Sequence, residues 1–312
     1  MESSPPLASS SLDTAQGQPV APPRELGRRS RIERFLFVLP AFLFQLIWGW
    51  YPILVAFILS FTNARLKRMP DFVGLQNYVR LWHDPLMAKA FRVTLTYASM
   101  SVVLTFVIPI FVAILLMEMP DRIRRWMMLL WFLPLSGIAS TILWRYMYNV
   151  RYGLFQNILR SLGLPEQRFL NDAKMVLFWL IFPSMLFYAP GLIYMAALQS
   201  IPTSYYEAAE IEGASFWRKI WTISLPRLRP VITMMMTFSI IGSLQIFDWP
   251  QIMTGSAGDP GGAARTVVMY IYQPLWSSLR LGDATAMAVM LFLVIMTLTL
   301  LYRTFFKEDP DA

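Results

Sequence analysis

The chain has 312 residues, of which 56% are hydrophobic and only 15% charged, and its mean hydropathy is +0.48. Soluble domains carry about 25% charged residues, so this composition excludes a soluble protein and predicts a membrane protein. The absence of Cys excludes disulfides and thiolate metal sites, and the single His excludes a multi-His metal centre. No phosphate-binding G-x-x-x-x-G-K-[ST] motif occurs. In a membrane protein, the net charge of +8 is better explained by orientation and contact with membrane lipids than by nucleic-acid binding.

The first thirty residues differ in composition from the rest of the chain. They are rich in Ser, Pro and Ala and show no periodicity, so residues 1–30 are predicted to form a disordered tail. A cleaved signal peptide is excluded, because the apolar run that follows is too long and the basic cluster at Arg28–Arg34 lies too deep. Residues 31–312 are predicted to form a single membrane domain.

Long apolar stretches predict how often the chain crosses the membrane. A helix needs about 20 mainly apolar residues to span the hydrocarbon core. The continuous apolar runs lack the alternation of β-barrel strands, so the fold class is an all-α membrane protein. Thr266–Leu279 is short and contains Pro274, and it is predicted to be a lateral or re-entrant segment on the surface. Six transmembrane helices are predicted, at 35–61, 93–117, 126–146, 175–199, 226–247 and 284–304.

Charge predicts orientation and limits the source of energy. Basic residues are dense in Arg24–Arg34 and Arg122–Arg125, which favours two cytoplasmic termini on the same side of the membrane. The apolar cores of the six spans contain no acidic, basic or His residue. Ion-coupled carriers usually keep such groups within the bilayer, so the energy for any transport is expected to come from outside the membrane. A carrier coupled through backbone carbonyls and a structural anchor remain as alternatives.

The segment 200–225, between the fourth and fifth spans, has the features of a docking device. Ser204-x-x-Glu207 predicts a capping box that starts a short helix, and Gly213 predicts its left-handed end. A second amphipathic helix is expected over 214–223, closed by Leu225-Pro226 before the fifth span. The small residues Ala208 and Ala209 would allow a partner protein to approach closely. An interfacial amphipathic loop explains the same pattern.

Polar residues in the spans are candidates for a solute path. Ser239, Gly242, Ser243 and Ile246 fall at helical spacing on one face of the fifth span. Their hydroxyls could bind a sugar, but small residues at this spacing also pack helices together in lipid. Gln245 and Tyr188 are further candidates, because an amide binds hydroxyls and an aromatic face stacks on a sugar ring.

The ordered motifs resemble a known family. Glu207-Ala-Ala-x-x-x-Gly213-Ala214, followed by Leu225-Pro226, resembles the EAA loop of ABC-importer permeases. The resemblance extends over roughly residues 33–306 and is closest to carbohydrate-uptake permeases of the maltose and glycerol-phosphate type, in the MalF-like half. Glu212 stands where that family usually has Asp. Further matching segments are Phe72-Val-Gly-Leu-Gln-Asn-Tyr78, Asp84-Pro85, Ala197-Leu-Gln-x-Ile-Pro202, Met253-Thr-Gly255 and Gly282-x-Ala284-x-Ala286.

The resemblance implies a MetI-like permease fold and a role as a transport subunit rather than an enzyme. It implies import of a sugar or oligosaccharide across the bacterial inner membrane, with no catalytic residue, metal or cofactor in this chain. ATP and Mg would be bound by two ATPase subunits, and the other partners would be a second permease subunit and an extracytoplasmic solute-binding protein. A secondary carrier or channel, and a membrane scaffold or enzyme, are the competing classes. The resemblance assigns ATPase coupling to Ser204, Glu207, Ala208, Ala209, Gly213, Ala214, Leu225 and Pro226.

Overall fold

The computed structural model describes residues 28–65, 70–132, 137–186, 190–277 and 280–305, which form helices joined by turns and loops. The chain divides into two compact units, residues 1–54 and 55–312, which are treated separately. The described residues contain no β-strand, only two isolated bridges. The all-α fold class is therefore as predicted, and the predicted tail falls outside the described residues except for residues 28–30, which belong to the first helix.

The first unit contains helix α1 (Arg28–Gln45), a π-helical turn (Leu46–Trp50) and the start of α2 (Tyr51–Leu59). The apolar part, Phe35–Leu59, is a continuous helix of 25 residues. At about 1.5 Å per residue it is long enough to cross the hydrocarbon core, in agreement with the first predicted span.

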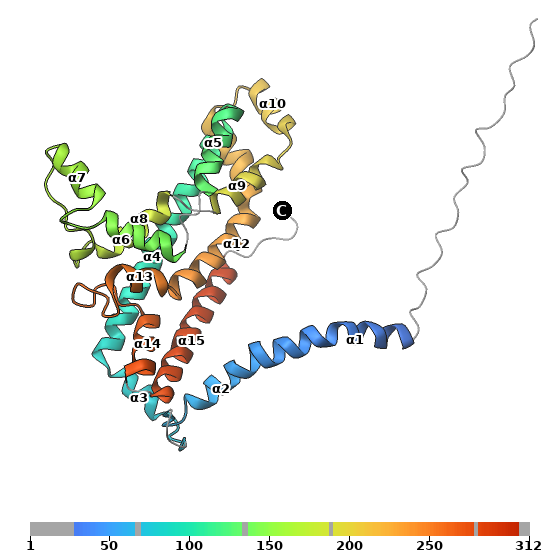
Figure 1. Ribbon diagram of the computed structural model, residues 1–312. Helices are drawn as coiled ribbons and strands as arrows, with labels where there is room; N and C mark the ends of the chain where they lie inside the picture. The colour runs from blue at the N-terminus through green and yellow to red at the C-terminus, as the bar shows by residue number, and fades with distance from the viewer. Residues whose placement is uncertain (1–27, 66–69, 133–136, 187–189, 278–279, 306–312) are drawn as a thin grey trace, which may run out of the picture. The chain divides into compact units, whose positions relative to one another are not determined.

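The second unit carries the remaining helices, which Figure 1 labels in chain order. They are α3 (Gln76–Trp82), α4 (Pro85–Met117), α5 (Asp121–Phe132), α6 (Ile138–Met147), α7 (Leu154–Ser161), α8 (Val176–Leu186), α9 (Pro190–Gln199), α10 (Thr203–Ile211), α11 (Phe216–Lys219), α12 (Leu225–Leu244), α13 (Asp248–Thr254), α14 (Val267–Ser277) and α15 (Leu281–Phe305). Shorter helical turns are the 3-10 turn Phe169–Asn171 and the π-helical turn Ile220–Ser224.

Fewer spans are evident than the six predicted. Three described helices are long and apolar enough to cross a membrane: Phe35–Leu59, Pro85–Met117 and Leu281–Phe305. A fourth would be the pair Phe216–Leu244 and Asp248–Thr254, which are bent by 44° at their junction. The predicted spans 126–146 and 175–199 each appear as two shorter helices, with residues 133–136 and 187–189 between them outside the described residues. The count of six stays a prediction.

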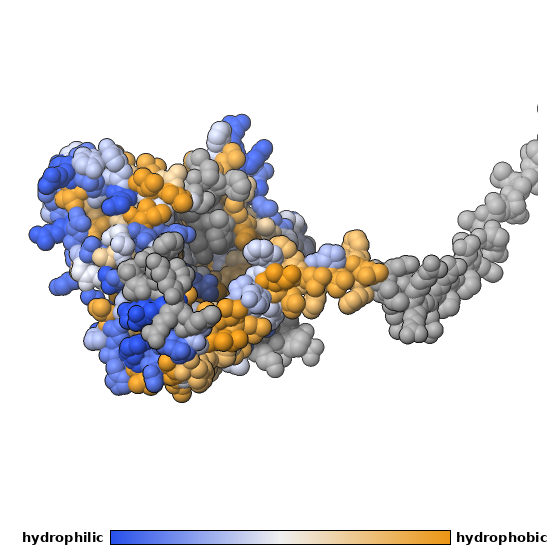
Figure 2. All heavy atoms as spheres, turned by 60° about the horizontal axis from the view of Figure 1, so that its bottom comes forward, coloured by the Kyte–Doolittle hydropathy of each residue, from blue (hydrophilic) through white to orange (hydrophobic). Residues whose placement is uncertain are grey.

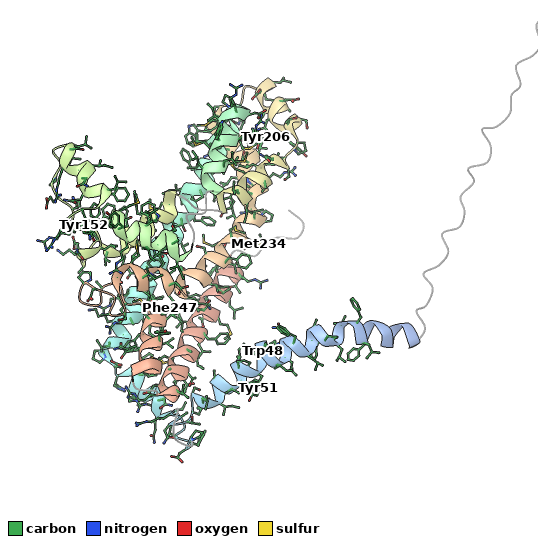
Figure 3. All side chains as sticks on the ribbon, viewed as in Figure 1. Trp48, Tyr51, Tyr152, Tyr206, Met234 and Phe247 are labelled. Atoms are coloured by element: carbon green, nitrogen blue, oxygen red, sulfur yellow. The ribbon has the colours of Figure 1, made fainter. Side chains whose placement is uncertain are left out.

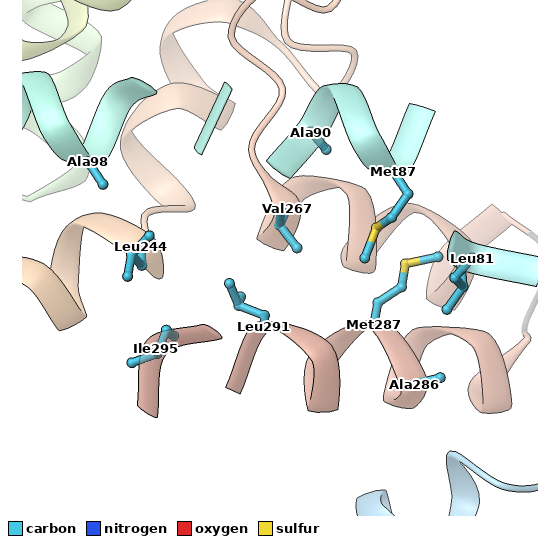
Figure 4. Close-up of a cluster of buried hydrophobic side chains, with 10 residues drawn as sticks. All are labelled: Leu81, Met87, Ala90, Ala98, Leu244, Val267, Ala286, Met287, Leu291 and Ile295. Carbon is cyan, nitrogen blue, oxygen red and sulfur yellow. The ribbon is translucent and has the colours of Figure 1, made fainter. Parts of the chain in front are cut away.

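Helix α4 is the central element of the second unit, because it takes part in all three clusters of buried apolar side chains. The first cluster, shown in Figure 4, joins α4 to α3, α12, α14 and α15. The second joins α4 to α6, α8 and α13, and the third joins its C-terminal end to α9 and the start of α12. Burial of apolar side chains along one long helix therefore positions both ends of the domain.

Helix α14 corrects the prediction for residues 266–279. The segment was expected to lie on the surface, but Val267 and Met269 are buried, and Val267 belongs to the first cluster. Figure 1 shows α14 running beside α15. One face of the short helix packs into the bundle, and the hydropathy of the segment could not reveal which neighbours would cover it.

Asp84 anchors α14 to the start of α4. Its carboxylate accepts hydrogen bonds from the Leu86 backbone N–H, at 2.9 Å, and from the Tyr270 hydroxyl, at 2.6 Å. The first of these bonds is an N-cap interaction, made one residue before the helix-starting Pro85. Burial raises the pKa of Tyr270 to about 12, and the hydrogen bond to Asp84 adds to the shift.

Replacing Tyr270 with Phe should remove this anchor while keeping the aromatic ring. We expect the free energy of unfolding at pH 8 to fall by about 2 kcal/mol, because one hydrogen bond to a carboxylate is lost. A raised pKa stabilises the folded state below the unfolded pKa of about 10, and that contribution disappears as the pH rises through about 12. Denaturation of both proteins from pH 8 to 12 should show a shallower alkaline loss for the variant. An unchanged alkaline profile would contradict this role of Tyr270.

Candidate functional site: the coupling segment

We call residues 200–225 the coupling segment. Its first helix, α10, presents one continuous stripe of exposed residues. Ser204, Glu207, Ala208 and Ile211 follow one another at spacings of three, one and three residues, and all four are exposed. Residues so spaced share one face of a helix. Ile211, at the end of the stripe, is 88% exposed, although it is a large apolar residue. A small, partly apolar stripe with one carboxylate suits contact with another protein.

The end of α10 is a Schellman motif centred on Gly213. The Gly213 N–H donates to the Glu210 carbonyl at 3.0 Å, and the Ala214 N–H donates to the Ala209 carbonyl at 2.8 Å. Gly213 has φ +73°, a left-handed conformation that costs residues with a Cβ about 1–2 kcal/mol. The prediction that Gly213 ends this helix is confirmed.

Side-chain contacts attach α10 to the helical stretch that follows it. The Tyr206 hydroxyl lies 3.0 Å from the Ser224 hydroxyl, and the Lys219 ammonium donates to the Glu210 carboxylate at 2.9 Å. The hydrogen bond to Glu210 raises the pKa of Lys219 above its ordinary value. The Arg227 guanidinium also lies 4.8 Å from the centre of the Tyr205 ring, a cation–π contact.

The covered side of the segment belongs to the third cluster. Ile201, Ile220 and Leu228 are buried there together with Tyr194, Met195 and Leu198 of α9. Tyr206, which Figure 3 labels at the α10 end of the domain, packs against the same cluster. The segment is therefore fixed to the ends of α4, α9 and α12 and cannot move independently of them without losing buried apolar contacts.

Two predictions for this segment are wrong. Helix α10 begins at Thr203 after Pro202 and has no side-chain cap, so Ser204 lies within the helix and no capping box forms. The N-cap position is taken by Pro202, whose side chain has no acceptor for the free N–H groups of the first turn. Leu225-Pro226 does not end the second helix, because residues 216–244 form one continuous helix.

A π-helical turn explains how this helix continues through Pro226. Proline lacks an N–H and its ring collides with the carbonyl four residues earlier in a regular α-helix. The turn Ile220–Ser224 directly precedes α12, in which Pro226 occupies the first turn. The wider π turn displaces the carbonyl that would collide. Helix α11 is therefore continuous with the predicted fifth span.

The candidate solute-path residues do not share one accessible face. Ser243 is buried, and its hydroxyl donates to the Ile240 carbonyl of its own helix at 3.1 Å. Ser239 is half-buried, and Gln245 is exposed just after the end of α12. Tyr188 lies outside the described residues. Along α12 from residue 230 onward, the exposed side chains are instead Pro230, Met234 and Phe238, at a spacing of four residues and in line with Gly242 and Gln245.

Sequence reasoning missed several residues of the coupling segment. Ile211 lies four residues after Glu207, so helical spacing alone could have placed it on the exposed stripe. The Tyr206–Ser224 and Lys219–Glu210 contacts join two helices across the Gly213 turn. Their partners depend on the angle of that turn, which the sequence pattern does not give.

The geometry agrees with the comparisons to known proteins. The sequence profile of a family described as "Binding-protein-dependent transport system inner membrane component" matches residues 86–307. The chain belongs to this family. The match covers α4 to α15 and includes the whole coupling segment, so the chain is a multi-pass membrane component of a transport system and not an enzyme.

Several curated relatives cover nearly all of the chain. The probable ABC transporter permease YurN of Bacillus subtilis is 28% identical over 91% of this chain and 99% of its own length. The arabinooligosaccharide permease AraP of the same organism is 30% identical over 89% and 90%. The sulfoquinovosyl glycerol permease SmoG of Agrobacterium fabrum is 31% identical over 89% and 92%. The predicted resemblance to carbohydrate-uptake ABC permeases is confirmed.

A solved structure has the same fold. One chain of a bacterial alginate ABC transporter, crystallised with a periplasmic protein carrying an alginate pentasaccharide, gives a TM-score of 0.80 over 89% of this chain and 95% of its own. The sequence identity is 21%, so this likeness concerns the fold alone. It confirms the predicted permease architecture.

Replacing Tyr206 with Phe should weaken the link between α10 and the helix that follows. The variant keeps the ring in the third cluster but leaves the buried Ser224 hydroxyl without its partner. Loss of one such bond costs about 1 kcal/mol. We therefore expect about fivefold lower transport per ATP hydrolysed in reconstituted vesicles. Tyr205→Phe, at the neighbouring exposed tyrosine, is the matched control, and an equal effect of both changes would contradict the link.

Proposed function

We propose that this chain is one of two permease subunits of an ATP-driven importer for a sugar or oligosaccharide. The exposed stripe of α10 carries the proposal, because it combines a carboxylate, a small residue and an exposed apolar side chain on one helix face. Two ATPase subunits would bind ATP and Mg²⁺, and an extracytoplasmic solute-binding protein would deliver the solute. The names of two relatives support the solute class, since AraP is named for arabinooligosaccharides and SmoG for sulfoquinovosyl glycerol.

The coupling mechanism follows from the contacts of α10. Glu207 is the charged group of the stripe and would pair with a basic side chain of the ATPase. Ala208 is small enough for the partner's backbone to approach, and Ile211 offers an apolar anchor. When ATP binding moves the ATPase surface, the Tyr206 and Lys219 contacts carry α11 and α12 with α10. This would be a rigid-body change between two packed states.

The proposal fixes the orientation of the chain. The stripe must face the cytoplasm, which places both termini there, and the loops at the opposite ends of the spans then face outward. Basic residues at Arg122–Arg125 support this arrangement. The solute path would run between the two permease subunits, with the exposed face of α12 near Met234, labelled in Figure 3, and Gln245 at its wall. Ser239 and Tyr188 remain candidate contacts, and Ser243 would act through packing.

Reconstitution tests the proposal against its alternatives. The complete complex is placed in vesicles with its binding protein outside and either ATP or a proton or sodium gradient as the only energy source. We expect uptake of a labelled oligosaccharide with internal ATP and none with a gradient alone. Uptake that follows the gradient and ignores ATP would assign the chain to the secondary carriers.

A further inference from the structure

A cavity with two cationic side chains lies at the end of the domain opposite α10. It has a volume of about 270 Å³ and is formed between the first turns of α4 and the loop that joins α13 to α14. The cations are Lys89 of α4 and Arg265 of the loop, and Asp259 is the carboxylate of the lining. In Figure 2, which brings this end of the domain forward, hydrophilic surface lies beside apolar surface.

Each of the two cations donates a hydrogen bond to a backbone carbonyl, and neither forms an ion pair with a carboxylate among the described residues. The Lys89 ammonium donates to the Gly261 carbonyl at 2.6 Å, and the Arg265 Nε donates to the Ala257 carbonyl at 2.9 Å. An ammonium has three donors and a guanidinium five, so each cation keeps donors for a ligand. Two positive charges against one negative charge favour an anionic group in the cavity.

Two lining glycines add backbone donors. Gly261 and Gly262 have φ +61° and +74°, and within the described part of the chain neither backbone N–H donates to an acceptor. A Cβ at Gly262 would lie 3.6 Å from the Lys89 ammonium, so the missing side chain leaves space beside that cation. Free N–H groups in left-handed turns next to cations are a common setting for oxyanions.

The rest of the lining points to a hydroxylated ligand. Asp259 can accept hydrogen bonds from hydroxyl groups, while Leu86 and Ala90 offer apolar surface to C–H groups. The volume lies near the lower end of small-molecule sites, about 300 Å³, which suits one sugar ring. We propose that this cavity binds a saccharide unit carrying one oxyanion, such as a uronate carboxylate, at the outer face of the domain. This inference rests on the proposed function and specifies its solute class.

Binding to the purified complex in lipid nanodiscs tests this assignment. The probes are glucuronate, glucose as its neutral counterpart, and inorganic sulfate as an ion without a sugar. We expect glucuronate to bind tightly enough to give a dissociation constant, with glucose at least tenfold weaker. Lys89→Gln should weaken glucuronate binding about tenfold, because a charge-assisted hydrogen bond is lost. Lys89→Arg should restore most of the affinity.

Arg92→Gln is the matched control, since Arg92 is an exposed cation one turn further along α4 that does not line the cavity. Its effect should stay within about twofold. Equal losses in Lys89→Gln and Arg92→Gln, or equal binding of glucose and glucuronate, would overturn the assignment. Sulfate binding as tight as that of glucuronate would mean an ion site only and would overturn the saccharide part. If the binding assay gives one of these contrary results while a neutral oligosaccharide is still imported with ATP, this inference fails and the proposed function stands.

Discussion

Replacing Gly213 with Pro should separate ATP hydrolysis from transport. Proline fixes φ near −65° and lacks an N–H, whereas Gly213 has φ +73° and donates to the Glu210 carbonyl. The Schellman end of α10 therefore cannot form, and the stripe would no longer be held against α11. We expect uptake of solute to fall at least about tenfold in vesicles, while the ATPase subunits continue to hydrolyse ATP.

Two further variants separate backbone geometry from general damage. No atom lies within 4 Å of a Cβ added at Gly213, so Gly213→Ala tests the cost of the left-handed conformation alone, about 1–2 kcal/mol. Gly213→Asn should be milder, because Asn adopts this conformation more readily. The expected order of transport activity is Gly, Asn, Ala and then Pro. Normal uptake by the Pro variant, inserted in the membrane at the usual level, would contradict a rigid coupling segment.

Replacing Gly282 with Ala should have the largest effect on folding. An added Cβ would lie 2.1 Å from the Thr62 carbonyl oxygen and 3.2 Å from the Asn77 amide nitrogen. The Thr62 oxygen belongs to the backbone and already accepts a hydrogen bond from Asn77 at 2.9 Å. The start of α15 would have to move away from Thr62 and from Asn77 of α3, with a loss of about 2–3 kcal/mol or more.

The surroundings of Gly282 make such a movement costly. The next residue, Asp283, is buried at 5% exposure and forms ion pairs with Arg80 of α3 and with Arg280. Moving α15 would expose or unpair this carboxylate. Gly242→Ala in α12 is the matched control, because an added Cβ there meets no atom within 4 Å. Thermal unfolding should show a lower midpoint for Gly282→Ala alone, and equal midpoints would show that the contact is not tight.

Local signals allowed the coupling segment to be predicted, and tertiary contacts explain what was missed. Gly213 could be placed because a left-handed helix end is a property of a few neighbouring residues. The need for glycine at 282 depends on Thr62 and Asn77, which are distant in the sequence, so no local pattern reveals it. The ion pair of Arg80 with Asp283 was missed for the same reason.

The helices show the same division between local and tertiary effects. Hydropathy located α4 and α15 well but placed the start of α4 eight residues late, because Pro85 and the cap by Asp84 lie before the apolar run. It also could not foresee that residues 216–244 form one helix, since Pro226 alone predicts a break and the compensating π turn has no sequence signature. Ser243 looked accessible by spacing, but its burial depends on how α12 packs.

Cross-linking tests the central claim that α10 is held by a separate ATPase. The chain contains no Cys, so Ala208→Cys introduces a single reactive thiol into the exposed stripe. Ser161→Cys, at the exposed end of α7 in a segment that the proposal places outside the cell, serves as the control. In the assembled complex, we predict that a short thiol cross-linker joins Ala208→Cys, but not Ser161→Cys, to a cysteine on the ATPase, with a yield that changes when ATP binds. Modification of Ala208→Cys by an impermeant reagent from outside intact cells, with no product on the ATPase, would contradict the account.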